Sequence, residues 1–205
     1  MKKYHKIQSI FRREREHNKV IIGAYTLPEF EYLQNNVWRF DEKLDGINLR
    51  VQFDHDATVR AFQGRTDNAQ LPVHIVEKLE ETFPLKKLVD YFGCSACLYG
   101  EGIGRGIEKV GKYISKDTAF ILFDVKIGKY WLRRMDVIEI ANRLKIKHSD
   151  EIGKGTLAEA VEMTRNGFKS QWGDFIAEGL VLRPELPLQG RTCGRIITKI
   201  KYKDF

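Results

Sequence analysis

A single lysine, Lys43, stands between a short apolar segment and an Asp-Gly turn formed by Asp45 and Gly46. A lysine held at the mouth of such a turn is a candidate nucleophile. An ordinary lysine amine has a pKa near ~10.4, so deprotonating it at pH 7 costs about 4–5 kcal/mol. The rest of the chain must therefore supply groups that favour the neutral amine and an electrophile for it to attack.

Further ionisable residues recur at the ends of predicted strands. Arg65 and Glu101 each follow one, and Glu178 begins another. Lys199 and Lys201 lie two residues apart in the last predicted strand, so their side chains share a face. Two lysines directed into an apolar core would be costly. This pair is therefore expected to face either water or an anion.

The composition is that of a folded, basic protein. The chain has 205 residues, 42% of them hydrophobic, and a formal net charge of +7, which suits a polyanion such as nucleic acid or ATP. Three cysteines are too few for a disulfide framework and favour a reducing compartment. There is no apolar leader and no run approaching ~20 apolar residues. These features predict a cytoplasmic protein without a membrane span.

The pattern of elements predicts one α+β domain over residues 1–205. Residues 1–36 are expected to be an N-terminal lead-in, and no C-terminal OB-fold or helical domain is expected after Lys201. Strands and hairpins intermixed with helices favour antiparallel sheets over a doubly wound parallel sheet. The predicted strands are 37–43, 46–53, 58–62, 96–99, 120–127, 130–132, 178–183 and 195–201, and the predicted helices are 28–33, 72–92 with a break at Pro84, 134–145 and 156–168.

Two short patterns resemble ligand motifs but are incomplete. Glycines alternate from Gly100 to Gly106, a spacing that does not match the dinucleotide-binding fingerprint. They are expected instead to let a ligand approach the backbone around Glu101. Cys94 and Cys97 have the spacing of a zinc knuckle, but no second pair completes four ligands, so both are expected in the core.

Five short motifs occur in order along the chain: Glu42–Gly46, Leu98–Gly102, Phe120–Asp124, Glu178–Arg183 and Lys199–Lys201. Together they resemble the motif set of the covalent nucleotidyltransferases, the superfamily of ATP-dependent DNA ligases, RNA ligases and mRNA-capping enzymes. A single Lys-x-Asp-Gly match is weak evidence, whereas five motifs spread from residue 42 to residue 201 are specific. The resemblance implies a nucleotidyltransferase (ATP-grasp-like) fold, with antiparallel sheets flanked by helices around a nucleotide cleft.

One position discriminates within this superfamily. DNA ligases and capping enzymes usually carry arginine five residues after the lysine, and this chain has Asn48. That pattern is similar to RNA ligases of the bacteriophage and RNA-editing type, and the loop around Arg65 resembles the arginine motif of the same enzymes. An RNA ligase is therefore the first expectation. The alternatives are a DNA ligase core, a capping guanylyltransferase and a non-catalytic nucleic-acid-binding module.

The resemblance implies a three-step reaction. The amine of Lys43 attacks the α-phosphorus of ATP and forms lysyl-AMP with release of pyrophosphate. The AMP then passes to the 5′-phosphate of an RNA strand, and a 3′-hydroxyl seals the junction and expels AMP. The implied partners are ATP and RNA ends, in RNA repair by a monomeric enzyme.

The resemblance also implies the site residues. Lys43, Lys199 and Lys201 are the expected catalytic residues, and the two C-terminal lysines are expected to favour the neutral amine of Lys43. Glu178, with Glu101, is expected to hold Mg²⁺ or Mn²⁺, since carboxylate oxygens suit these ions. Glu101 is also expected to accept from the ribose hydroxyls, and Phe123 to stack on adenine, unless it is a core residue. The full nucleotide-binding set is Glu42, Lys43, Asn48, Arg65, Glu101, Phe123, Glu178, Lys199 and Lys201.

Overall fold

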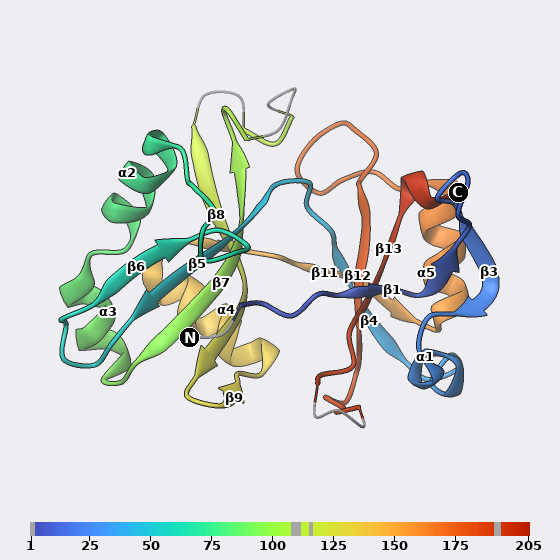
Figure 1. The fold of residues 1–205 in the computed structure, drawn as a ribbon, viewed down its shortest axis with the longest axis horizontal. Coiled ribbons are helices and arrows are strands. Elements are labelled where there is room, and N and C mark those ends of the chain that lie inside the picture. The colour runs from blue at the N-terminus through green and yellow to red at the C-terminus, as the bar shows by residue number, and fades with distance from the viewer. Residues whose placement is uncertain (1–2, 108–111, 115–116, 191–193) are drawn as a thin grey trace. The chain divides into compact units, whose positions relative to one another are not determined.

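The chain divides into two compact units in the computed structural model, which describes residues 3–107, 112–114, 117–190 and 194–205. The central unit comprises Asp45–Ser149 together with the residues up to His5. The terminal unit comprises Lys6–Leu44 and Asp150–Phe205. Figure 1 shows that each unit has its own sheet with helices packed against it.

The central unit is built on a six-stranded sheet that is mostly antiparallel. The short strand β10 is the exception, because it pairs with β8 in parallel. The strand β9 (Tyr130–Trp131) forms a hairpin with β8. The strand order is β10 (Lys147–His148), β8 (Thr118–Ile127), β7 (Ala96–Gly104), β5 (Ile47–Phe53) and β6 (Arg60–Gln63).

Alternation along β5 gives this sheet one apolar and one polar face. Leu49, Val51 and Phe53 are buried in the hydrophobic core, whereas Asn48 and Arg50 point to the opposite side. Three helices contribute apolar side chains to that core, and Pro84 separates the first two, as its missing N–H predicts. They are α2 (Val73–Thr82), α3 (Leu85–Phe92) and α4 (Arg134–Leu144).

The terminal unit is built on a five-stranded sheet. Its order is β1 (Gln8–Ser9), β13 (Thr198–Lys201), β12 (Gly179–Pro184), β4 (Trp38–Glu42) and β11 (Glu151–Gly155), with β1 parallel to β13 and the other pairs antiparallel. The remaining elements are a hairpin of β2 (Phe11–Arg13) and β3 (Val20–Tyr25), the helices α1 (Pro28–Tyr32) and α5 (Leu157–Asn166), and the 3₁₀ turn η1 (Tyr202–Asp204).

The core of the terminal unit lies on one face of this sheet. Trp38 and Phe40 of β4 are buried there against α1 and α5. Ile10 and Phe30, from the segment expected to be a lead-in, are buried in the same core. Residues 6–35 are thus an integral part of this unit. The other face of β4 carries Arg39 and Asp41, and that face leads to Lys43.

The predicted fold class is confirmed, because the chain is α+β with mainly antiparallel sheets. Two details differ from the prediction. The pairings of β1 and β10 are parallel, since each short strand is reached by a long connection. The strand β7 continues to Gly104, so Glu101 lies within a strand and does not follow one. None of the described helices is long and apolar enough to cross a membrane.

Two glycines that flank Glu101 lie against core side chains. A Cβ atom on Gly100 would lie 2.3 Å from the ring of Phe120, and one on Gly102 would lie 2.6 Å from Leu49. Both neighbours belong to the hydrophobic core. These two glycines therefore make room for core side chains, and the approach of a ligand to the backbone around Glu101 stays a prediction.

Candidate active site

Lys43 shares a carboxylate with a second lysine. Its Nζ donates to Oε2 of Glu178 at 2.5 Å and to the carbonyl of Leu44 at 3.1 Å. The other oxygen of Glu178 accepts from Nζ of Lys201, also at 2.5 Å. The carboxylate side chain is only 10% exposed and each lysine side chain 19%. Two ammonium groups and one anion therefore form a partly buried cluster with an excess of positive charge.

The strand pairing of the terminal unit produces this cluster. In the register, β12 lies between β4 and β13, with Leu180 opposite Glu42 and Gly179 opposite Lys201. The backbone N–H of Lys43 donates to the carbonyl of Gly179 at 2.9 Å. A Cβ on Gly179 would lie 2.1 Å from the carbonyl of Ile200. Only glycine allows this close approach, which brings Glu178 to the end of both neighbouring strands.

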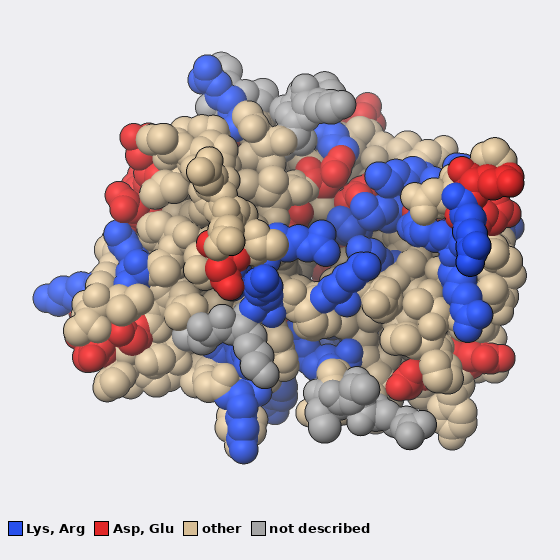
Figure 2. Space-filling view, in the orientation of Figure 1, with Lys and Arg blue, Asp and Glu red and all other residues tan. Residues whose placement is uncertain are grey.

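The face of the sheet around this cluster is rich in cations. Lys199 is half-buried and lies opposite Val181, on the same face as Lys201. Arg183 on β12 forms an ion pair with the buried Asp41 on β4. Figure 2 shows Lys and Arg side chains gathered where Figure 1 draws β12, β13 and η1. Such a surface suits a phosphate-bearing ligand.

Glu42 precedes the lysine and is 4% exposed. Its Oε1 accepts from the hydroxyl of Ser170 at 2.5 Å and its Oε2 from the backbone N–H of Gln171 at 2.9 Å. The carboxylate therefore fixes the end of β4 from which Lys43 follows. Its predicted contact with a nucleotide stays a prediction.

Asp204 holds Lys201 in place from the C-terminal turn. It is fully buried, and its carboxylate accepts from the backbone N–H of Lys201 at 3.0 Å and from Arg13 at 2.6 Å. We expect Asp204→Ala to lower the free energy of unfolding by about 3 kcal/mol, because it leaves a partly buried guanidinium without its partner. Urea denaturation would measure this loss. A change below about 1 kcal/mol would contradict the assigned role.

In the central unit, Asn48 and Glu101 lie opposite each other on the polar face of the sheet. Oε1 of Glu101 accepts from the backbone N–H of Gly46 at 3.2 Å, and the N–H of Asp45 donates to the hydroxyl of Tyr113 at 2.9 Å. These bonds hold the backbone of Asp45 and Gly46, which follow the lysine in the chain. Oδ1 of Asn48 is buried without a hydrogen-bond partner among the described residues. An unsatisfied buried acceptor of this kind is suited to a ligand donor.

Phe123 lies outside the hydrophobic core that contains Phe120. It coincides with a register shift in the pairing of β7 and β8, which disrupts the alternation along β8. Its ring meets that of Tyr4 edge-on, with centroids 5.1 Å apart, and Tyr4 donates to Asp124 at 2.6 Å. Sequence reasoning missed Tyr4, because the pairing joins positions 120 residues apart.

Arg65 is exposed in the loop that follows β6. It is therefore accessible to a ligand, as its predicted role requires. Sequence reasoning overlooked Arg50, a buried arginine that contacts the same loop. Its place two residues after Asn48 on an alternating strand was the available signal.

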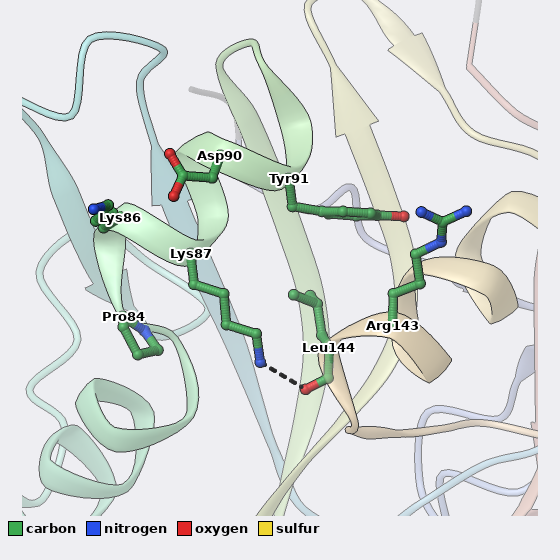
Figure 3. Close-up of a pocket in the computed structure, with 7 residues that line it drawn as sticks. All are labelled: Pro84, Lys86, Lys87, Asp90, Tyr91, Arg143 and Leu144. Atoms are coloured by element: carbon green, nitrogen blue, oxygen red, sulfur yellow. Dashed lines mark hydrogen bonds between the residues drawn. The ribbon is translucent and has the colours of Figure 1, made fainter.

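A hollow of about 700 Å³ lies between α3 and the end of α4 (Figure 3). Arg143 contacts the ring of Tyr91 there but is already paired with Glu139 at 2.9 Å. Nζ of Lys87 donates to the carbonyl of Leu144 at 3.4 Å. The lining contains none of the predicted site residues, so it is not the candidate active site.

The donor set suits a hard divalent ion held mainly by substrate oxygens. Among the described residues, no three His, Cys, Asp or Glu side chains are grouped as metal ligands. The carboxylate of Glu178 offers hard oxygen donors beside the lysine nucleophile. Mg²⁺ characteristically takes one or two protein carboxylates and completes its shell with phosphate and water. The carboxylate of Glu178 therefore fits the predicted Mg²⁺ or Mn²⁺. A zinc site would instead need a group of Cys or His ligands.

Comparison with known proteins gives one family and one fold. The profile of the RNA ligase family matches residues 36–203. No curated protein matches the chain by sequence.

Among solved structures, the chain resembles a ligand-free variant of Naegleria gruberi RNA ligase with a TM-score of 0.68 and 17% identity, over 98% of this chain and 57% of that one. A variant of the same enzyme with ATP and Mn gives a TM-score of 0.67 and 17% identity, over 97% and 57% of the two chains. The chain thus spans little more than half the length of these proteins.

Proposed function

Because the chain belongs to the RNA ligase family, we propose that it is an ATP-dependent RNA ligase that carries AMP on Lys43. The observation that supports this most directly is the carboxylate of Glu178, which is shared by Lys43 and Lys201. A lysine that serves only as a surface charge needs neither partial burial nor a second cation beside it. ATP and Mn are bound to the similar Naegleria gruberi enzyme, and we propose ATP with Mg²⁺ or Mn²⁺ here.

In the proposed first step, Nζ of Lys43 attacks the α-phosphorus of ATP. A nitrogen–phosphorus bond forms, the bond to the pyrophosphate oxygen breaks, and the amine gives up a proton. The amine must be neutral to attack, and the ammonium of Lys201 on the same carboxylate opposes a second positive charge there. Lys199 and Lys201 would hold the phosphates, for which Lys201 would have to leave Glu178.

Glu178 would hold the divalent ion, which supplies charge neutralisation on the phosphates when bound. The same carboxylate accepts from both lysines, so the ion would lie beside the proposed nucleophile.

The central unit supplies the proposed nucleotide contacts. Phe123 would stack on adenine, and Glu101 would accept from the ribose hydroxyls and assist with the metal. Asn48 and Arg65 would contact the sugar-phosphate and the 5′-phosphate of RNA, to which the AMP passes. Attack by a 3′-hydroxyl then forms the phosphodiester and releases AMP.

Incubation with α-labelled ATP and Mg²⁺ tests the proposal. We expect covalent label on the protein, stable to denaturation, from ATP and at least tenfold less from α-labelled GTP. Preferential labelling by GTP would indicate a capping guanylyltransferase. A protein that takes no label from either nucleotide would contradict the proposal.

Asn48 tests the choice of RNA over DNA. We expect Asn48→Ala to reduce sealing of a pre-adenylated RNA nick by about 10²-fold, because the amide contacts the reacting strand. Gln52→Ala is a matched control, since Gln52 lies four residues further along the same face of β5. The comparison uses nicks with RNA or DNA at the 3′-hydroxyl side. Equal sealing of all-DNA nicks, or an unaffected Asn48→Ala variant, would favour the DNA ligase alternative.

A further inference from the structure

Arg50, which has no role in the proposed reaction, donates hydrogen bonds to the loop that carries Arg65. Arg50 lies on the polar face of β5 and is only 1% exposed. Its Nε donates to the carbonyl of Gly64 at 3.0 Å, and its Nη2 donates to Oδ1 of Asp67 at 2.7 Å. These two acceptors flank Arg65 and Thr66. A single rigid guanidinium therefore fixes both ends of a four-residue loop.

Among the described residues, few other contacts hold this loop. Gly64 follows β6 directly and is buried against Ala69, where a Cβ would come within 2.8 Å. One backbone hydrogen bond, from the N–H of Ala69 to the carbonyl of Thr66 at 3.2 Å, closes the turn. Arg65 itself is exposed. The two bonds made by Arg50 therefore hold the loop on either side of Arg65.

Stability does not explain why an arginine occupies this position. Moving a guanidinium out of water is costly, and its partner Asp67 has a side chain that is 55% exposed, which weakens the pair by solvent screening. In addition, Nη1 of Arg50 is buried without a hydrogen-bond partner among the described residues. An apolar side chain of similar size would be tolerated at least as well. The position of the loop is what requires the arginine.

We propose that Arg50 is a positioning residue that holds the Gly64–Asp67 loop so that Arg65 contacts the nucleotide or the 5′-phosphate. The inference rests on the proposed function for the role of Arg65. The clamp, by which we mean the hydrogen bonds from Arg50 to Gly64 and Asp67, rests on the contacts of Arg50 alone. The two can therefore be tested separately.

The variant Arg50→Met removes the guanidinium and its two hydrogen bonds to the loop but keeps a side chain of similar size. We expect a melting temperature within about 3 °C of wild type, a KM for ATP in self-adenylation raised at least tenfold, and kcat changed less than threefold. Arg50→Lys, which keeps the charge but can reach only one acceptor, should recover part of this loss. Arg60→Met is the control, because Arg60 lies on the same hairpin and donates to Phe83 instead.

A double variant tests whether Arg50 acts through Arg65. We expect Arg50→Met combined with Arg65→Ala to be within twofold of Arg65→Ala alone, since the clamp has nothing left to position. Effects that multiply would overturn the proposal. So would an Arg50→Met variant with wild-type KM.

Amide hydrogen exchange provides a readout that does not depend on activity. In Arg50→Met we expect the amides of residues 65–69 to exchange at least tenfold faster, with β5 and β6 unchanged. If the exchange rates of residues 65–69 are the same in Arg50→Met as in wild type, the proposal that Arg50 holds the loop is overturned, whatever the activity of the variant. If Arg50→Met does not fold, Asp67→Ala releases one end of the loop and should give the same selective increase. If the wild-type protein takes no label from ATP, the proposed function is contradicted. The hydrogen-exchange measurement then still tests whether Arg50 holds the loop.

Discussion

Lys43→Ala is expected to abolish covalent labelling by α-labelled ATP, with a loss of at least about 10⁴-fold, because the reacting nitrogen is removed. Lys43→Arg should fail equally, since a guanidinium stays protonated at all accessible pH values and cannot act as the nucleophile. The measurement is the fraction of protein labelled after single-turnover incubation. The partly buried Glu178 keeps Lys201 as a partner, so the fold should be retained in both variants.

Two comparisons make this result specific. Lys154→Ala removes a lysine of the same unit that pairs with the exposed Glu185, and it should label like wild type. Lys43→Ala supplied with pre-adenylated RNA bypasses the first step and should retain sealing above background. Residual label on Lys43→Ala at a tenth of the wild-type level or more would show that another residue is the nucleophile.

Glu178→Gln is expected to have the second largest effect. The amide keeps the shape but removes the negative charge that Lys43 and Lys201 share, so two ammonium groups then face each other in a partly buried site. Self-adenylation should fall by at least about 10³-fold, because both the proposed metal ligand and the anchor of the lysines are lost. Removing the shared partner should also lower the free energy of unfolding by about 3 kcal/mol.

The matched control for this variant is Glu185→Gln. Glu185 is an exposed carboxylate that pairs with Lys154 at 2.9 Å, so its loss should change stability by less than about 1 kcal/mol. Labelling by α-labelled ATP and urea denaturation should be measured on both variants. A Glu178→Gln protein that labels within tenfold of wild type would refute its proposed role as metal ligand and lysine partner.

Much of the local structure is determined by the sequence alone. The alternation of Leu49, Val51 and Phe53 defines a strand with one buried face, and it places Asn48 and Arg50 on the other. Pro84 separates two helices because it cannot donate a backbone hydrogen bond. Such patterns have short range and depend on side-chain periodicity. They were sufficient for the fold class and for the ordered motifs that belong to the RNA ligase family.

Local periodicity could not show where strands end or which strands pair in parallel. The expected end of β7 near Tyr99 was wrong because the glycines that follow read as a loop in sequence. In the structure they accept core side chains against a continuing strand. Likewise, the segment before Asn36 carries charges typical of a solvated lead-in, yet Ile10 and Phe30 complete the core of the terminal unit.

The sequence determined that Lys43 stands beside an Asp-Gly turn and that ionisable residues recur at strand ends. Only the tertiary structure decided which of them meet. Lys43 and Glu178 are 135 residues apart, and the pairing of β12 with both β4 and β13 brings Glu178 to two lysines at once. The hydrogen bonds from Arg50 to the loop that carries Arg65 likewise depend on the register between β5 and β6. Contacts of this kind arise from strand register and core packing, which no short stretch of sequence contains.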